Sequence, residues 1–577
     1  MKTLYCNGRI YTGEGFAEAF AVEDGKFLSV GEASGSYDRL VDLKGKFVCA
    51  AFNDSHMHLL NYGQALQMAQ LHKHTDSLGG MLEYVKEFLQ EHPLREGQWL
   101  KGRGWNQDYF SDVQRMPSRD DLDQISRDIP IQLTRACGHT CVVNSKVLEI
   151  CGITEETKAP VGGRIGQENG RLDGRFYDNA MNLLTPFVPL PGKEEIKDMI
   201  RAACKALNSY GITSSQSDDY CVFRAIPFEV INEAYQELEE SGELTVRVYE
   251  QSNFTTLPEL KRFVQSGNVT GRGSDLFRIG PLKMLGDGSL GARTAHLSRP
   301  YADDPSACGF SLFADEHMQE MVSYANKNGM QIAIHAIGDA CLDQVLNSLD
   351  NALKECPRED HRHGVVHCQI SRPDQLQRIA DLKLHVYAQS IFLDYDNHIV
   401  EARVGKELAD SSYSWKTLMK RGVTVSNGSD CPVELPDCLK GIECAVTRTS
   451  LDGTGPYLPE EAFTVREGLD SFTKEAAKAS FEEDRKGLIK EGYLADFTVL
   501  GEDPFAVDPR EIHAIPVLET YLNGKRVFLK KAGRPSSVIF LRRTALPASS
   551  RSAAGLRQRS SAAAFRQHSG PSHRWAG

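Results

Sequence analysis

The chain has 577 residues, 41% of them hydrophobic and 25% charged, and its formal net charge is −12. This composition is typical of a globular protein, and the negative charge argues against a nucleic acid or an anionic membrane as the main partner. No apolar run approaches membrane-spanning length, and the N-terminus lacks the apolar region of a signal peptide, so we expect a cytoplasmic location. The 14 cysteines include no C-x-x-C pair, which fits buried thiols in a reducing compartment.

The two ends of the chain both read as short strands. Residues 1–50 alternate polar and apolar side chains between glycine-containing turns, and a similar pattern returns in residues 485–533. An Asn-Gly turn begins a strand in each part, at Asn7-Gly8 and at Asn523-Gly524. Neither part has enough strands to bury a face alone, so we predict one small β-sandwich built from both termini.

The segment between them, residues 51–484, alternates strand-like and helical stretches, which is the pattern of βα units. Helices are predicted over residues 194–209, 316–327 and 464–479. Eight strands in this order predict a (β/α)8 (TIM) barrel, α/β in class. The predicted strands cover residues 48–52, 212–216, 244–249, 277–285, 331–335, 364–367, 384–388 and 423–426.

Two segments depart from the barrel pattern. The interval after the first strand is too long for one βα unit and has mixed α and β texture, so about residues 62–190 are predicted to be an inserted subdomain near the barrel mouth. Residues 534–577 are rich in arginine and serine and contain no lysine, aspartate or glutamate. That composition cannot build a core and predicts a disordered basic tail. An altered reading frame or fusion scar is an alternative, and a basic interaction arm ranks below both.

Two histidines, His56 and His58, lie in the segment "NDSHMHLL" just after an apolar run. Residues i and i+2 of a strand point to the same face, so both imidazoles can aim at one point, as metal ligands do. Histidines with this spacing are also common on surfaces and in cores, so the pair needs further ligands before it indicates a metal site.

Further metal-binding residue types stand where a barrel places its catalytic groups, at the C-terminal ends of strands. His335, His367 and Asp430 each end a predicted strand, and Lys283 lies inside an otherwise apolar one. Taken singly, each has an ordinary explanation: a core histidine, a capping aspartate or a lysine that extends its amine to solvent. Convergence of five strand ends on one barrel mouth favours a shared site.

Other histidine and cysteine groups do not meet these criteria. His72 and His74 lie in polar sequence, and His361 and His363 precede the strand that His367 ends, which places them near the barrel floor. We interpret these four as structural or solvated. The cluster from Cys137 to Cys141 lacks a matching second half and is interpreted as packing.

These motifs resemble the binuclear amidohydrolase superfamily and, more narrowly, its "amidohydrolase 3" branch, which includes N-substituted formamide deformylases. The resemblance extends from about residue 5 to residue 530. It implies a metal-dependent (β/α)8 barrel flanked by a β-sandwich from both termini. The phrases that carry it are "FNDSHMHLLNYG", "GRGWNQDYF", "CGHTCVVNSKVLEICGI", "LKMLGDGSLGARTA", "IHAIGDAC", "HRHGVVHCQ" and "NGSDCPV".

In such a site His56, His58 and Asp430 would hold one divalent metal ion, and His335 and His367 a second. Imidazole and carboxylate ligands suit zinc, with manganese, iron and nickel as open alternatives. A protonated lysine cannot ligate a cation. The resemblance implies that Lys283 is carbamylated and bridges the metals.

The expected activity is hydrolysis of a C–N bond in a small amide-type substrate, such as an N-substituted formamide. A metal-bridging hydroxide would attack the carbonyl, with Asp430 as general base. One alternative is a mononuclear deaminase, which typically carries a glutamate near the third position after His335, where this chain has Gly338, and does not need Lys283. Another is a catalytically silent, metal-free scaffold protein.

The residues that bind the substrate are harder to predict than the metal ligands. The insertion and the loop 286–295 are expected to line the pocket and to supply Trp105, Asn106, His139 and Arg293. Local packing or hydrogen bonding is the ordinary alternative for each. Neither a nucleic acid nor a membrane is expected as a partner, and a homodimer is left open.

Overall fold

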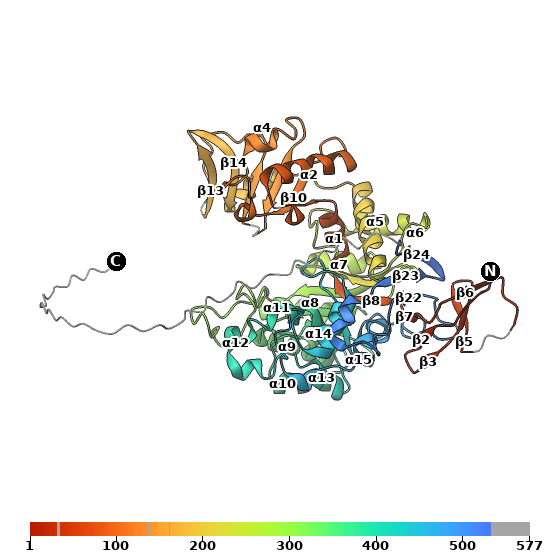
Figure 1. Cartoon of the computed structure of the whole chain (residues 1–577). Coiled ribbons are helices and arrows are strands. Elements are labelled where there is room, and N and C mark those ends of the chain that lie inside the picture. The colour runs from red at the N-terminus through yellow and green to blue at the C-terminus, as the bar shows by residue number, and fades with distance from the viewer. Residues whose placement is uncertain (32–34, 75, 137–138, 161, 532–577) are drawn as a thin grey trace, which may run out of the picture. The chain divides into compact units, whose positions relative to one another are not determined.

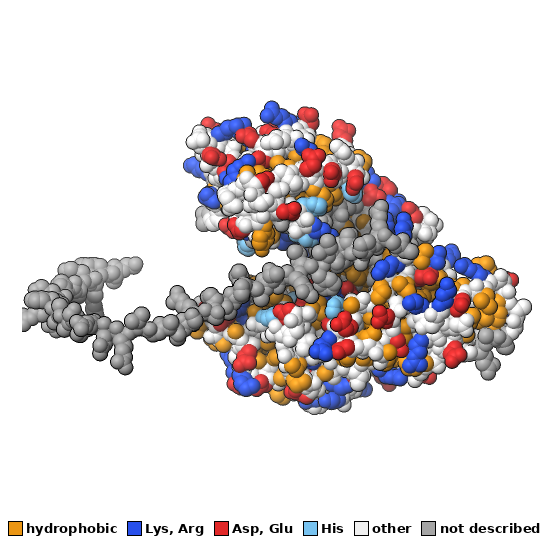
Figure 2. All heavy atoms as spheres, viewed as in Figure 1, with side chains coloured by type: hydrophobic (Ala, Val, Ile, Leu, Met, Phe, Trp, Pro, Cys, Tyr) orange, Lys and Arg blue, Asp and Glu red, His pale blue; other side chains and the backbone are white. Residues whose placement is uncertain are grey.

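The computed structural model of the protein describes residues 1–31, 35–74, 76–136, 139–160 and 162–531 (Figure 1). Residues 1–530 form one compact unit. The predicted tail 534–577 lies outside the described residues, as do Cys137 and Gly138 of the cysteine cluster. Among the described residues, no helix is both long enough and apolar enough to span a bilayer. Acidic and basic side chains are interspersed over the face shown in Figure 2.

The centre of the unit is an eight-stranded parallel sheet whose strands pair in chain order, as predicted for a barrel. Its strands are β8 (Phe52–Met57), β15 (Ile212–Ser217), β16 (Arg247–Asn253), β17 (Phe277–Leu285), β18 (Ile332–Ala336), β19 (Gly364–His367), β20 (His385–Ala388) and β21 (Val425–Asn427). The sheet is nearly closed, because the segment after β21 meets the end of β8. There, the Asp430 amide donates to the His56 carbonyl (2.8 Å) and the His58 amide to the Cys431 carbonyl (2.8 Å).

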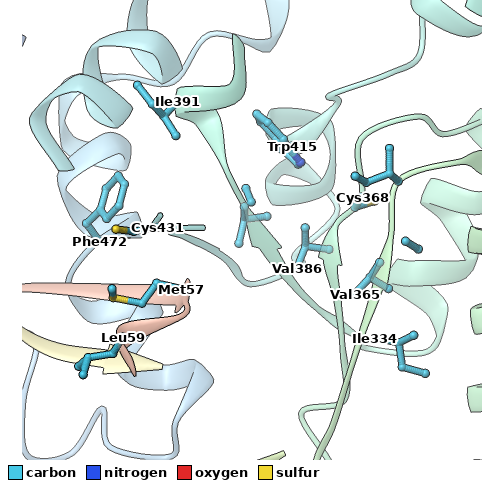
Figure 3. Packing of buried hydrophobic residues seen from close by; sticks show 14 of the residues in the cluster. Met57, Leu59, Ile334, Val365, Cys368, Val386, Ile391, Trp415, Cys431 and Phe472 are labelled. Carbon is cyan, nitrogen blue, oxygen red and sulfur yellow. The ribbon is translucent and has the colours of Figure 1, made fainter. Parts of the chain in front are cut away.

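Helices connect the barrel strands or follow the last of them (Figure 1). They are α5 (Lys193–Ser209), α6 (Phe228–Glu240), α7 (Leu257–Gln265), α8 (Asp315–Lys327), α9 (Asp339–Glu355), α10 (Pro373–Asp381), α11 (Leu393–Asp396), α12 (Val400–Ala409), α13 (Trp415–Lys420), α14 (Cys438–Thr447), α15 (Val465–Ser471) and α16 (Lys474–Ala479). Figure 3 shows apolar side chains of strands and helices, among them Met57, Val386 and Trp415, in the buried core between them.

The helix predicted over residues 464–479 is two helices, α15 and α16. Thr473 has φ −129° and ψ −92°, outside the helical range, and interrupts the helical hydrogen bonding. The prediction of one continuous helix is therefore wrong. By contrast, the helix predicted over residues 194–209 is present as α5, which buries Ile196, Ile200, Ala203 and Leu207 along one face.

The first predicted barrel strand, residues 48–52, is also wrong in its bounds. The apolar run divides at Ala51 into β7 (Phe47–Ala50), which pairs in a different sheet, and β8, which belongs to the barrel. An uninterrupted apolar run does not reveal where one strand ends and the next begins. As a consequence, His56 lies within the barrel strand and His58 directly after it.

Strands from both ends of the chain pair in one six-stranded sheet, in the order β24-β23-β22-β7-β2-β3. A four-stranded sheet, β5-β4-β1-β6, comes from the N-terminal part alone. The two sheets share a core in which the ring centroids of Phe20 and Phe497 are 5.0 Å apart. The strands are β1 (Thr3–Cys6), β2 (Arg9–Tyr11), β3 (Phe16–Ala17), β4 (Phe20–Glu23), β5 (Lys26–Val30), β6 (Arg39–Asp42), β22 (Phe497–Leu500), β23 (Val517–Leu522) and β24 (Lys525–Leu529).

The long interval between β8 and β15 builds its own six-stranded sheet, in the order β13-β14-β12-β11-β10-β9. This segment has two hydrophobic cores of its own. Its elements are α1 (Leu59–Leu66), β9 (Ala69–Gln70), α2 (Leu78–Glu91), β10 (Leu100–Trp105), α3 (Arg119–Leu122), β11 (Ile131–Arg135), β12 (Thr140–Val143), α4 (Ser145–Cys151), β13 (Gly163–Glu168) and β14 (Arg171–Asp178). The domain boundaries predicted from the sequence stay predictions.

Candidate metal centre

The orientation of His56 is fixed by Gln251, a neighbour from β16. The Gln251 side-chain amide donates its Nε2–H to the Ser55 carbonyl (3.1 Å), which turns its Oε1 toward His56. Oε1 can only accept, so His56 Nδ1 donates to it (2.7 Å). In the neutral ring the other nitrogen, Nε2, then carries a lone pair, and it lies 3.3 Å from Asp430 Oδ1. Burial, with the charge of Lys283, lowers the pKa of His56 to about 4.

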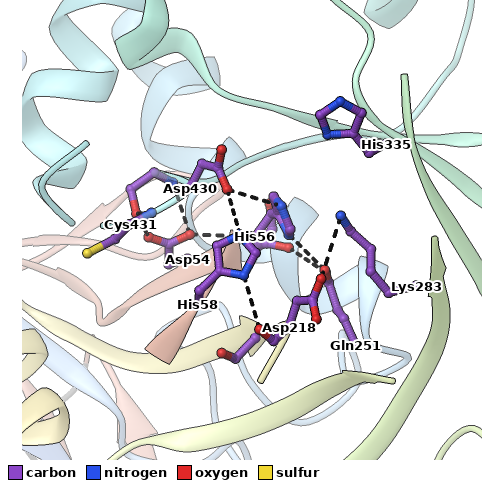
Figure 4. A network of polar contacts seen from close by, with 12 residues as sticks. Asp54, His56, His58, Asp218, Gln251, Lys283, His335, Asp430 and Cys431 are labelled. Atoms are coloured by element: carbon purple, nitrogen blue, oxygen red, sulfur yellow. Dashed lines mark hydrogen bonds and ion pairs between the residues drawn. The ribbon is translucent and has the colours of Figure 1, made fainter. Parts of the chain in front are cut away.

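His58 is oriented in the same way by a backbone group. Its Nδ1 donates to the Asp218 carbonyl (3.0 Å), and its Nε2 lies 3.1 Å from the same Oδ1 of Asp430. Burial lowers the pKa of His58, but the hydrogen bond to Asp430 outweighs burial and raises it well above its usual value. Two imidazole nitrogens and one carboxylate oxygen therefore converge (Figure 4). Atoms with lone pairs approach this closely only when a proton or a cation lies among them.

Asp430 is placed by a tight turn after β21. Gly428 is required in this turn, because a Cβ there would lie 2.6 Å from the His56 amide nitrogen. Asp54 holds the turn by accepting hydrogen bonds from the amide (3.0 Å) and hydroxyl (2.5 Å) of Ser429. Burial raises the pKa of Asp430, but its close contacts with the Nε2 atoms of His56 and His58, which stabilise the carboxylate, outweigh burial and hold that pKa well below its usual range. The side chain is therefore a carboxylate at neutral pH.

Lys283 is a fully buried amine on β17. Its Nζ lies 3.9 Å from Asp218 Oδ2, and among the described residues it has no hydrogen-bond partner. Burial lowers the pKa of Lys283, which increases the neutral amine fraction. A buried nitrogen without a hydrogen-bond partner costs free energy. The Lys283 amine is therefore suited to bind or react with a further group.

His367 ends β19 in a left-handed conformation, with φ 73°. Its ring centroid lies 5.7 Å from that of His56 and 4.4 Å from that of His335. Its Nδ1 is buried and has no partner among the described residues. Ligand atoms of His56, His367 and Asp430 all lie within 4.8 Å of one another. Burial and the neighbouring His335 keep the pKa of His367 well below its usual value.

His335 is next to His367 but its Nε2 faces other groups. That nitrogen lies 3.2 Å from Asp287 Oδ1 and 3.1 Å from the Gly288 carbonyl. Figure 4 shows His335 apart from the residues around Asp430. The structure thus brings together His56, His58, His367 and Asp430, with Lys283 beside Asp218. The pairing of His335 with His367 on a second metal stays a prediction.

The four residues predicted to bind substrate are engaged locally. Trp105 is fully buried in the core of the insertion and donates its indole N–H to a backbone carbonyl (3.0 Å). Asn106 accepts a hydrogen bond from an arginine (2.9 Å). His139 and Arg293 each contact an aspartate, at 3.2 and 2.9 Å. Local bonding accounts for each position, and their role in substrate binding stays a prediction.

Four polar residues around the site were not predicted: Asp54, Asp218, Gln251 and Asp287. Each lies within a barrel strand or within two residues of its C-terminal end, and that position was the available signal. Asp218 also belongs, with His58 and Cys221, to a second group whose ligand atoms lie within 4.8 Å of one another.

The histidines set aside in the sequence lie away from this centre. His361 and His363 precede β19, whereas His367 ends it. The Nε2 atoms of His361 and His363 contact the Leu382 carbonyl (3.1 Å) and the Asn326 side-chain oxygen (3.0 Å). His74 stacks on Tyr84, with ring centroids 3.7 Å apart.

Comparison with known proteins identifies the family. The model of the amidohydrolase family (Amidohydro_3) matches residues 39–528. The chain belongs to the amidohydrolase family. It is 33% identical to the Bacillus subtilis protein named "Putative amidohydrolase YtcJ", over 92% of this chain and all of that one. It is 25% identical to the N-substituted formamide deformylase of Arthrobacter pascens, over 88% and 94% of the two chains. A solved structure from Pyrococcus furiosus, described as an uncharacterized metal-dependent hydrolase, superposes with a TM-score of 0.72 at 28% identity, covering 88% and 100%.

Proposed function

We propose that this amidohydrolase is a metal-dependent enzyme that hydrolyses a C–N bond of a small amide-type substrate, with N-substituted formamides as the first class to test. The observation that carries the proposal is the convergence of His56 Nε2 and His58 Nε2 on Asp430 Oδ1, at 3.3 and 3.1 Å. Hydrogen bonds on the far side of both rings point these nitrogens inward, an arrangement that histidine ligands of metals commonly show. The names of the relatives support the reaction class.

We propose two divalent ions for this donor set. His56, His58 and Asp430 would hold one, with His335 and His367 for the second, and zinc is favoured by the ligand types. Such ions, when bound, lower the pKa of water toward neutrality and polarise a carbonyl. Lys283 would complete the site as a carbamate. Its neutral Nζ forms a bond to the carbon of carbon dioxide and loses a proton, and the new oxygens replace the partner that the amine lacks.

The chain's own groups then position and move protons. Gln251 and the Asp218 carbonyl each accept a hydrogen bond from Nδ1, so in the neutral form of each imidazole the unprotonated nitrogen is Nε2. The Asp430 carboxylate would take the proton of the attacking water and deliver it to the departing amine, which must leave protonated. A single carboxylate can serve both steps, because it lies at the centre of the converging ligands.

The test compares Lys283→Ala with Asp430→Asn, measuring bound metal and turnover on a panel of N-substituted formamides, aryl amides and cyclic amides. We expect Lys283→Ala to lower the metal content and abolish turnover, with partial rescue by small carboxylic acids. Asp430→Asn keeps an oxygen near the metal, so most metal should remain while turnover falls by roughly 10²–10⁴-fold.

Lys486→Met is the matched control, because Lys486 is also a buried lysine but pairs with Glu482 (2.5 Å) and contacts Ser214 (3.3 Å), near the start of β15. This variant should keep its metal. Normal metal content and turnover in Lys283→Ala would refute the carbamate, and a purified protein that binds no divalent metal would favour the scaffold alternative. The cytoplasmic location and the homodimer stay predictions.

A further inference from the structure

A cavity of about 720 Å³ lies between the insertion, including its helix α1, and helix α5. Its size is within the range of small-molecule sites, about 300–1,000 Å³. None of the six residues predicted for the metal centre lines it. Its walls are largely apolar and include Leu66, Met68, Phe88, Trp99, Leu184 and Met199.

One cation, Lys101, lines this cavity without a partner. It lies on β10, opposite Gln132 of β11, and its side chain is half-buried. Within the described part of the chain, no hydrogen bond or ion pair involves its ammonium group. Burial lowers the pKa of Lys101, and no carboxylate offsets this effect.

The two carboxylates that line the same cavity are engaged elsewhere. Glu195 accepts hydrogen bonds from Gln98 and from the Gly192 amide (2.7 Å) at the start of α5, where a helix favours negative charge. Asp198 pairs with Arg95 (2.5 Å). Lys101 is thus an unpaired cation on an apolar wall, and the ligand that complements it has one anionic group and an apolar body.

We propose that this cavity binds a small amphipathic carboxylate, whose carboxylate pairs with Lys101 while an alkyl or aryl body fills the apolar space. An Nζ–carboxylate contact would give the ammonium the partner it lacks and raise its pKa, which burial lowers. The site is separate from the metal centre. Its occupancy therefore does not depend on the hydrolase activity proposed above.

The experiment is calorimetric titration of the chelator-treated protein with decanoate, decanol and decylamine. The unchanged protein should bind decanoate saturably. The affinity for decanol should be about tenfold or more lower, because decanol lacks the charged group that bonds to Lys101, and the affinity for decylamine should be lower still. Lys101→Gln should lower the affinity for decanoate by about 10–100-fold and leave the affinity for decanol unchanged. Arg103→Gln is the matched control, since Arg103 is an exposed cation on the same strand outside the cavity lining.

A second variant tests the cavity without altering its charge. Ala202 lines the cavity from α5, and Ala202→Phe should fill it and abolish binding of both decanoate and decanol. No saturable binding of decanoate by the unchanged protein would overturn the proposal. Equal affinities for decanoate and decanol, or undiminished decanoate binding in Lys101→Gln or Ala202→Phe, would do the same.

Discussion

Replacing Asp496 by alanine should destabilise the protein far more than removal of a surface charge. Asp496 precedes β22 of the terminal sheet and pairs with Arg247 of barrel strand β16, and both side chains are buried, at 6% and 3% exposure. Arg247 donates from Nε to Oδ2 (2.7 Å) and from Nη2 to Oδ1 (3.3 Å). This bidentate pair joins the C-terminal strands to the barrel.

The size of the destabilisation follows from the hydrogen bonds and charges that remain around Arg247 and Asn523. In Asp496→Ala, Arg247 retains the Asp275 carbonyl (3.0 Å) and the Asn523 side-chain oxygen (2.5 Å) but loses its counter-charge. The Asn523 amide, which donates to Asp496 Oδ1 (2.7 Å), also loses its acceptor. Breaking a buried pair in this way costs about 3–5 kcal/mol, because one charge is left uncompensated.

Urea unfolding followed by circular dichroism measures the effect. Asp496→Ala should lose about 3–5 kcal/mol of unfolding free energy, and the double variant Arg247→Met with Asp496→Ala should be more stable than Asp496→Ala alone. Glu407→Ala is the control, since Glu407 is 80% exposed in its pair with Arg299, and surface pairs contribute little. If Asp496→Ala unfolds at the same urea concentration as Glu407→Ala, the pair does not hold the terminal sheet to the barrel.

Three further outcomes are expected. Gln251→Met removes the acceptor for His56 Nδ1 and should weaken zinc binding by about 10–100-fold, measured by competition with a chelator. Deleting residues 1–45 exposes the partner strands in the six-stranded sheet and should cause aggregation in size-exclusion chromatography; a soluble, active product would contradict that architecture. Burial raises the pKa of Asp396 from 3.8 to about 6. Between these two pH values the folded state holds a proton on Asp396 that the unfolded chain has lost. The contribution of this proton to the free energy of unfolding is complete below pH 4 and is lost as the pH rises through 6. Asp396→Asn stays neutral, so relative to this variant the unchanged protein should lose about 3 kcal/mol of unfolding free energy over that interval; parallel stability curves would contradict the assignment.

The barrel could be predicted because short strand-like runs, several of them apolar, alternate with amphipathic helices. An apolar run does not show where one strand ends and the next begins. At β7 and β8, one apolar run contributes strands to two sheets, and only the pairing of those strands with others separates them. Metal-ligand types at strand ends, such as His367 and Asp430, could be found without coordinates, because a barrel gathers the ends of all its strands at one mouth. The orientation of the imidazole rings could not be predicted in this way. His335 has the predicted position, but Asp287 determines where its Nε2 points.

The residues that orient His56 and His58 escaped prediction for a different reason. β16 is buried along its whole length yet contains Arg247, Glu250, Gln251, Ser252 and Asn253, so hydrophobic periodicity gives no sign of which side chains face the barrel interior. A buried polar group is tolerated only with a partner, and the partner of Gln251 is His56, 195 residues earlier in the chain. Barrel geometry explains the pairing. β8 and β16 are separated by one strand, β15, and alternate strands contribute to the same layer of side chains inside a barrel. Strand order, rather than composition, is therefore the information that would place a hydrogen-bond acceptor from the third barrel strand beside His56 of the first.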